Sequence, residues 1–278
     1  KIYEKRILER GPKVVVVGGG TGLSTLLTGL KHRTSNITAI VTVADDGGSS
    51  GRLREEFGVL PPGDIRNCLV ALSDSEDILG PLFQFRFTQG KGLDGHNFGN
   101  LFITALARVT GDFAKAIKES SKVLAIRGQV YPATLETVKL VARKENGIEV
   151  EGECRIRDEK GSPIERLSLN PKDCKATEES VEAIKEADVI ILGPGSLYTS
   201  VMPNLLIEGI QNAIARSKAV KIYICNVMTE SGETDDYSVS DHIKTIIKHT
   251  RPGIINCCVA NVSRIPEDLY GKYKAEGQ

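Results

Sequence analysis

Residues 14–17 are four consecutive valines, followed at once by a glycine-rich turn and then by a segment with helical spacing. Four β-branched residues are too few to span a membrane and form helices poorly, so the run predicts a buried parallel strand. The glycines at 18, 19, 20 and 22 allow backbone N–H groups to approach a ligand closely. Because leucines of the segment 21–30 fall on one helical face, this order of strand, turn and helix N-terminus predicts a phosphate-binding unit.

The turn matches neither of the common nucleotide fingerprints. A dinucleotide pattern G-x-G-x-x-G starting at Gly18 would need glycine where Leu23 stands, and no P-loop lysine is present. We therefore predict phosphate binding without a standard NAD or ATP site. The alternative is a turn that serves only the tight packing of strand against helix.

The composition is that of an ordinary globular protein: 278 residues, 40% of them apolar and 26% charged, with a formal net charge of zero. We expect no nucleic-acid partner and no direct membrane insertion, because no overall charge attracts polyanions and no apolar run reaches membrane length. The six cysteines form no C-x-x-C pair, which favours a reduced, cytoplasmic setting.

Strand-like and helix-like segments alternate along the chain, which predicts an α/β fold with a mostly parallel sheet covered on both faces. We expect strands at about 13–17, 37–43, 123–127, 188–192, 220–225 and 254–259. Helices are expected near 21–32, 64–73, 99–108, 111–120, 178–186, 202–216 and 239–248.

Residues 134–157 have a different pattern, with apolar and polar residues alternating on both sides of an Asn-Gly hairpin turn at 146–147. We interpret this segment as an antiparallel hairpin inserted into the main sheet or appended to its edge. No linker or repeat divides the chain, so we expect a single domain over residues 1–278.

Ligands bind open α/β sheets beyond the carboxyl ends of the strands, where this chain carries several polar loops. Asp45 and Asp46 follow the second strand and could accept ribose hydroxyls or hold Mg²⁺. Asp64 could bind a ligand or cap a helix. His96 could be a general base or a structural hydrogen-bonding group, while the neighbouring asparagines suit sugar or base edges.

A second glycine turn, Gly-Pro-Gly-Ser at 193–196, follows the strand expected at 188–192. Two such turns on one sheet suit a ligand with two phosphates, or one phosphate on each of two substrates. The turn is not a nucleophile elbow, because its own residues do not form the pattern G-x-S-x-G. Tyr237, which ends the loop after the next strand, could stack on a base or sugar or pack beneath a helix end.

Together these segments resemble the CofD-like family, and most closely its gluconeogenesis-factor (YvcK-type) branch. The matching segments are 16–22, 45–54, 62–67, 96–100, 193–200 and 232–235, and Asp-Asp-Gly-Gly-Ser-Ser-Gly-Arg at 45–52 is the most specific of them. The resemblance implies a Rossmann-like, doubly wound fold, a nucleotide-type ligand and a homo-oligomer. Relatives of this kind continue past the position of Gln278, so we expect part of the site or of a dimer contact beyond it.

Transferase members of the family move a phospholactyl group from a guanosine diphosphate donor to a deazaflavin hydroxyl, using Mg²⁺ near the acids that correspond to Asp45 and Asp46. The gluconeogenesis-factor branch is similar to a regulator that binds UDP-sugars and supports cell shape and envelope synthesis. The segment 45–54 resembles the regulator branch, because transferase members carry bulkier residues after the acids. By the same resemblance, Tyr237 falls where this branch uses an aromatic residue for the nucleotide sugar.

We therefore expect a UDP-sugar-binding regulator without turnover. A Mg²⁺-dependent transferase of the 2-phospho-L-lactate type is the alternative, and an NAD(P)-dependent oxidoreductase is a third candidate that lacks the fingerprint's last glycine. The residues expected at the nucleotide and its phosphates are Gly18, Gly19, Gly20, Thr21, Gly22, Asp45, Asp46, Ser49, Gly63, Asp64, Asn67, Asn97, Asn100, Gly193, Gly195, Ser196, Tyr198, Asn226, Thr229 and Tyr237.

Overall fold

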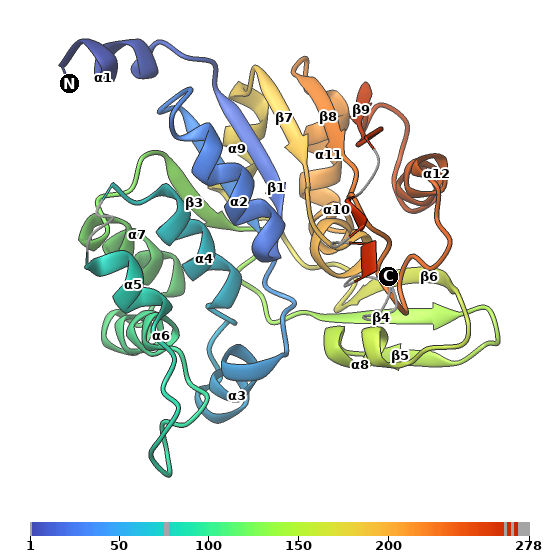
Figure 1. Cartoon of the computed structure of the whole chain (residues 1–278), viewed down its shortest axis with the longest axis horizontal. Coiled ribbons are helices and arrows are strands. Elements are labelled where there is room, and N and C mark those ends of the chain that lie inside the picture. The colour runs from blue at the N-terminus through green and yellow to red at the C-terminus, as the bar shows by residue number, and fades with distance from the viewer. Residues whose placement is uncertain (1, 75–77, 264–265, 268–269, 272–278) are drawn as a thin grey trace.

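The computed structural model describes residues 2–74, 78–263, 266–267 and 270–271. Its centre is a six-stranded sheet in the order β3-β2-β1-β7-β8-β9, and every neighbouring pair is parallel (Figure 1). The strands are β1 (Val14–Gly18), β2 (Ile37–Val41), β3 (Gln129–Pro132), β7 (Val189–Leu192), β8 (Val220–Ile224) and β9 (Cys257–Val259). The strand order reverses between β1 and β7, which is where doubly wound sheets bind ligands.

Helices cover both faces of this sheet (Figure 1). They are α1 (Ile2–Glu9), α2 (Gly20–Leu30), α3 (Gly48–Phe57), α4 (Gly63–Leu72), α5 (Leu79–Gln84), α6 (Phe98–Thr110), α7 (Phe113–Val123), α8 (Glu153–Asp158), α9 (Glu178–Glu186), α10 (Met202–Leu205), α11 (Glu208–Arg216) and α12 (Val239–His249), with a π-helical turn η1 (Leu197–Val201) before α10. None of these described helices is long and apolar enough to cross a membrane.

The two faces of the sheet form two separate hydrophobic cores, because successive side chains of a strand point to opposite faces. Val14 and Val16 of β1 belong to one core, together with residues of α2 and α4. Val15 and Val17 belong to the other, together with residues of α10 and α11. The valine run is therefore buried on both faces, as a central parallel strand must be.

A second, antiparallel sheet lies beyond the carboxyl ends of the main strands (Figure 1). Its order is β5-β4-β6, with β4 (Lys139–Lys144), β5 (Glu149–Glu151) and β6 (Ile164–Asn170). The predicted inserted hairpin is confirmed as the β4–β5 pair. The sequence pattern did not indicate the third strand, β6, or the short helix α8 that precedes it.

The parallel, doubly wound sheet is confirmed, but three local predictions are wrong. The strand expected at 123–127 is instead the end of α7 and the turn after it, where Leu124 is buried in the core while Val123 is exposed. The expected helix 202–216 is broken between α10 and α11, where Ile207 adopts an extended backbone. Residues 48–52 follow Asp45 and Asp46 in what the sequence suggests is a polar loop, but they form the start of α3.

Two glycine turns lie backbone to backbone where β1 and β7 end. The N–H of Gly193 donates to the carbonyl of Val17 at 2.9 Å. A Cβ atom at Gly22 would lie 2.9 Å from the carbonyl oxygen of Pro194, and one at Gly195 would lie 3.1 Å from the oxygen of Gly19. Side chains are therefore excluded from both turns at their closest approach.

Gly22→Ala is expected to lower the free energy of unfolding by about 1–3 kcal/mol, because the new methyl group would overlap backbone of the second turn. Gly29 offers a matched control on the same helix, since no heavy atom lies within 4 Å of its Cβ position. Gly29→Ala is expected to raise the stability by up to about 1 kcal/mol. Urea unfolding of both variants measures the difference, and equal effects would contradict the close packing of the turns.

Candidate functional site

Several helices begin at the carboxyl edge of the main sheet. The residues that precede α2, α3 and α4 are Gly19, Gly47 and Pro62, and none of them caps its helix with a side-chain hydrogen bond. The N–H groups of a helix's first turn have no partner within the helix, and they favour an anion. This edge therefore offers donors to a phosphate from more than one helix.

Asp64 lies against the first glycine turn. Its carboxylate accepts the N–H of Gly20, the first residue of α2, and a Cβ atom at Gly19 would lie 2.6 Å from its Oδ2. Burial, and then the nearby charge of Asp45, raise the pKa of Asp64 to about 6. The Asp64 side chain therefore stabilises the glycine turn after β1. It does not cap its own helix α4, whose N-cap residue is Pro62.

Asp45 and Asp46 face different partners. Asp45 accepts the N–H of Gly47 at 2.8 Å and the hydroxyl of Ser50, and burial raises its pKa. Asp46 accepts the N–H of Cys154 at 2.9 Å, which ties the β2 loop to the start of α8 in the second sheet. The two acids therefore belong to separate hydrogen-bonding groups.

This arrangement does not fit a preformed Mg²⁺ site on the Asp45–Asp46 pair. One oxygen of each carboxylate is already engaged by a backbone N–H. Within the part of the chain that the structure describes, no group of three or more acidic, histidine or cysteine side chains is placed to hold a metal ion.

Ser49, His96 and the predicted asparagines form one buried network beside α3 and α6. Ser49 Oγ lies 3.1 Å from Nδ1 of His96 and accepts the N–H of Asn97 at 3.3 Å. Asn97 caps α6 by accepting the N–H of Asn100 at 3.2 Å. His96 is 4% exposed and is held by these contacts, which places it in a structural hydrogen-bonding role in this conformation.

Arg66 joins the network to a third predicted asparagine, Asn67. Its guanidinium donates to Oδ1 of Asn100 at 2.9 Å and to Oδ1 of Asn67 at 2.7 Å. Burial lowers the pKa of Arg66 to about 10, and its Nε has no hydrogen-bond partner among the described residues. Asn67 and Asn100 thus turn their oxygens toward a buried cation.

The second glycine turn is held by side chains of the β8–α12 loop. Asn226 Oδ1 accepts the N–H of Gly195 at 3.1 Å. Tyr198, which lies in η1 just after Ser196, is buried, and its hydroxyl lies 2.8 Å from that of Tyr237. The half-buried ring of Tyr237 also meets His242 of α12 edge-on, with centroids 5.5 Å apart. Tyr237 therefore packs against a helix in this conformation, while Thr229 lies half-buried in the same loop.

Two further acids at this edge were absent from the sequence-based set. Glu233 is 4% exposed, accepts the hydroxyl of Thr199 at 2.9 Å, and has its pKa raised to about 7 by burial and by Glu230. Burial and the surrounding carboxylates raise the pKa of Glu153, in α8, above its usual range. Glu233 lies in the family-like segment 232–235, so the resemblance could have identified it as a site residue. Glu153 reaches this edge only through the fold of the second sheet.

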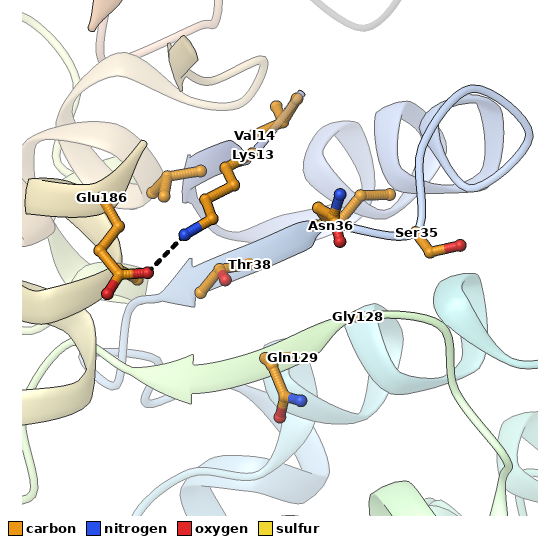
Figure 2. Close-up of a pocket in the computed structure, with 11 residues that line it drawn as sticks. Lys13, Val14, Ser35, Asn36, Thr38, Gly128, Gln129 and Glu186 are labelled. Carbon is orange, nitrogen blue, oxygen red and sulfur yellow. Dashed lines mark hydrogen bonds and ion pairs between the residues drawn. The ribbon is translucent and has the colours of Figure 1, made fainter. Parts of the chain in front are cut away.

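A hollow of about 290 Å³ lies at the opposite, amino edge of the sheet (Figure 2). Its lining includes Lys13, Asn36 and Gln129, and Lys13 forms an ion pair with Glu186 at 2.7 Å. None of the nucleotide-site residues predicted from the sequence lines this hollow. The chemistry that the sequence indicates is therefore gathered at the carboxyl edge.

The chain matches proteins of one family along almost its whole length. The family described as 2-phospho-L-lactate transferase CofD matches residues 14–278. A gluconeogenesis factor of Halalkalibacterium halodurans is 54% identical over 263 residues, which cover 95% of this chain and 81% of that protein. A putative gluconeogenesis factor of Clostridium acetobutylicum is 52% identical over 275 residues, which cover 98% of this chain but only 61% of that protein.

The fold agrees with this relationship. A crystal structure of a UPF0052 family member from Bacillus halodurans superposes with a TM-score of 0.94 at 53% identity, covering 96% of this chain and 86% of the other. The parallel sheet, the glycine turns and the sequence matches lead to one assignment. The chain belongs to the CofD family, with gluconeogenesis factors among its relatives.

Proposed function

We propose that this chain binds a UDP-sugar at the carboxyl edge of its main sheet and acts as a cytoplasmic regulator of the gluconeogenesis-factor type. Its role would link carbon metabolism to cell-envelope synthesis and cell shape. One observation carries the binding proposal: two glycine turns touch at neighbouring strand ends, and each is followed by a helical segment. The regulatory role rests on the family resemblance and on the names of the relatives.

The paired turns suit a diphosphate, because the starts of α2 and η1 lie within a small volume. The N–H groups of Gly20, Gly193 and Gly195 are engaged within the protein, so a phosphate would bind the other N–H groups at these helix starts. Charge-assisted N–H···phosphate bonds are stronger than neutral ones. A micromolar dissociation constant corresponds to about 8 kcal/mol, which a few such bonds together with sugar contacts can supply.

The acids at the edge suit the hydroxyl groups of a sugar. Asp45 and Asp64 lie beside the first turn, and burial raises the pKa of both. Such groups destabilise the folded protein when they are ionised, so their presence is better explained by ligand binding than by stability. A sugar hydroxyl would donate a further hydrogen bond to these carboxylates, beside those from Gly47, Ser50 and Gly20.

Transfer of a phospholactyl-type group to a hydroxyl acceptor is the second candidate, and the match to the transferase family description favours it. This function predicts that product forms only when Mg²⁺ is present. The hydrogen bonds already made by Asp45 and Asp46 give a preformed metal site no support. Incubation with nucleoside diphosphate donors, acceptors and Mg²⁺, followed by chromatography, separates this activity from binding alone.

Thr21→Glu is expected to weaken UDP-sugar binding at least tenfold. Thr21 is exposed in the first turn of α2, where an added carboxylate repels a phosphate yet suits the helix dipole, so the fold should be retained. Thr28→Glu adds the same charge about 10 Å further along the same helix and should change the affinity less than threefold. Calorimetric titration with UDP-N-acetylglucosamine and UDP-glucose, with and without Mg²⁺, measures both. Similar affinities of the two variants would refute phosphate binding at this turn.

Asp64→Asn is expected to stabilise the protein at pH 7.5 and to weaken UDP-sugar binding. The pKa of Asp64 is about 6 in the folded state against 3.8 for the ordinary group. The folded protein therefore binds the proton more tightly, and the destabilising contribution of the ionised acid develops as the pH rises from 3.8 to 6. The full shift corresponds to about 3 kcal/mol, so a gain of about 1–3 kcal/mol is expected above pH 6 and little below pH 4.

Asp241 provides the control with the opposite sign. Hydrogen bonds with Ser238 lower its pKa to about 2, so Asp241→Asn should destabilise the protein at pH 7.5. Urea unfolding at pH 4.5 and pH 7.5 measures both variants. An effect of Asp64→Asn that does not change with pH would contradict the raised pKa.

A further inference from the structure

A second hollow, of about 730 Å³, lies away from the glycine turns, along β6 and on the outer face of the antiparallel sheet. Residues of β4, β5 and β6 line it on one side, and the C-terminal end of α12 lines it on the other. Its volume is that of a site for a metabolite-sized ligand. None of the residues assigned above to the nucleotide lines this hollow.

Two arginines lie side by side on this face. Arg143 of β4 and Arg166 of β6 are directly opposite each other in the antiparallel register, so their side chains project to the same face of the sheet. Like charges at such a cross-strand pair destabilise a sheet. Arg143 is paired with Glu165 at 3.1 Å, whereas Arg166 has no acidic partner among the described residues. Glu149 of β5 also lies opposite Arg143 in the register, so Arg166 is the member of the pair without an ion-pair partner among the described residues.

Two lysines add to the positive charge. Lys172, which follows β6, and Lys248, in the last turn of α12, line the same hollow, and neither forms an ion pair with a described residue. The acids in the lining are Glu149 and Glu165, and the latter is already paired with Arg143. The lining thus carries four cationic side chains against two acids.

The wall formed by His249 is uncharged. Its Nε2 accepts the N–H of Leu167 at 3.0 Å, so its Nδ1 carries the proton and donates to the carbonyl of Thr245 at 2.9 Å. Its ring meets Tyr198 edge-on, with centroids 6.3 Å apart. The hollow is therefore bounded by a fixed neutral ring and a row of cations, with the apolar side chains of Val141 and Leu206 also in its lining.

We propose that this hollow is a second ligand site, for a small anionic molecule whose phosphate or carboxylate groups bridge Arg143 and Arg166. The ligand's anionic groups replace the acidic partner that Arg166 lacks. Lys172 and Lys248 contact the outer part of the ligand, and its carbon skeleton lies on the apolar part of the lining.

The test measures binding of tripolyphosphate and of citrate by calorimetry at low salt. It uses the Thr21→Glu protein, in which the glycine turn no longer attracts phosphate. Arg166→Glu is expected to lower the affinity for the bound anion at least tenfold. The same change should keep or raise the melting temperature, because it places opposite charges across β4 and β6. Arg33→Glu makes the same change of net charge on an exposed residue in the turn after α2 and should change the affinity less than twofold.

If only tripolyphosphate binds, the site takes a phosphorylated ligand, and if only citrate binds, it takes a polycarboxylate. If both bind, the site accepts either kind of anion. Absence of binding by both anions would overturn the proposal, as would equal weakening by Arg33→Glu and Arg166→Glu. The UDP-sugar proposal is tested separately, because Arg166→Glu in the otherwise unchanged protein should leave UDP-sugar affinity within twofold.

Discussion

The close contact between two glycine turns is the constraint on which the rest of the structure depends. β1 and β7 are neighbours at the point where the strand order reverses, so the chain must leave both strands through the same small volume. Backbone can pass backbone there only without side chains, as the positions of Gly22 and Gly195 show. The same contact brings the starts of α2 and η1 together, and Asn204 fixes it from α10 by donating to the carbonyl of Gly18 at 3.2 Å.

The antiparallel sheet completes the edge that the turns begin. Asp46 binds the start of α8, and the buried Lys144 of β4 donates to the carbonyl of Gly232 in the β8–α12 loop at 3.3 Å. These bonds hold the insert against two loops of the main sheet. Burial at this edge raises the pKa of Glu153 and of Glu233; nearby acids, including Asp45, raise that of Glu153 further, and Glu230 raises that of Glu233. The edge therefore combines N–H donors for an anion with acceptors for hydroxyl groups.

Local sequence patterns predicted the parts of the fold that depend on neighbouring residues. The valine run and the glycine turn gave β1 and the start of α2 correctly, because strand burial and backbone freedom are local properties. The apolar residues at 123–127 led to a wrong strand prediction, because Leu124 is buried by packing at the end of α7 and not by strand pairing. The approach of Glu153 to the site could not be predicted, because it depends on contacts between residues more than a hundred positions apart.

The most direct measurement is a crystal structure with UDP-N-acetylglucosamine bound. We predict that the diphosphate oxygens accept hydrogen bonds from the first turn of α2 and from the turn at 193–196, with the sugar near Asp45 or Asp64. A diphosphate bound at the amino edge of the sheet, or on the arginine pair of the antiparallel sheet, would contradict it.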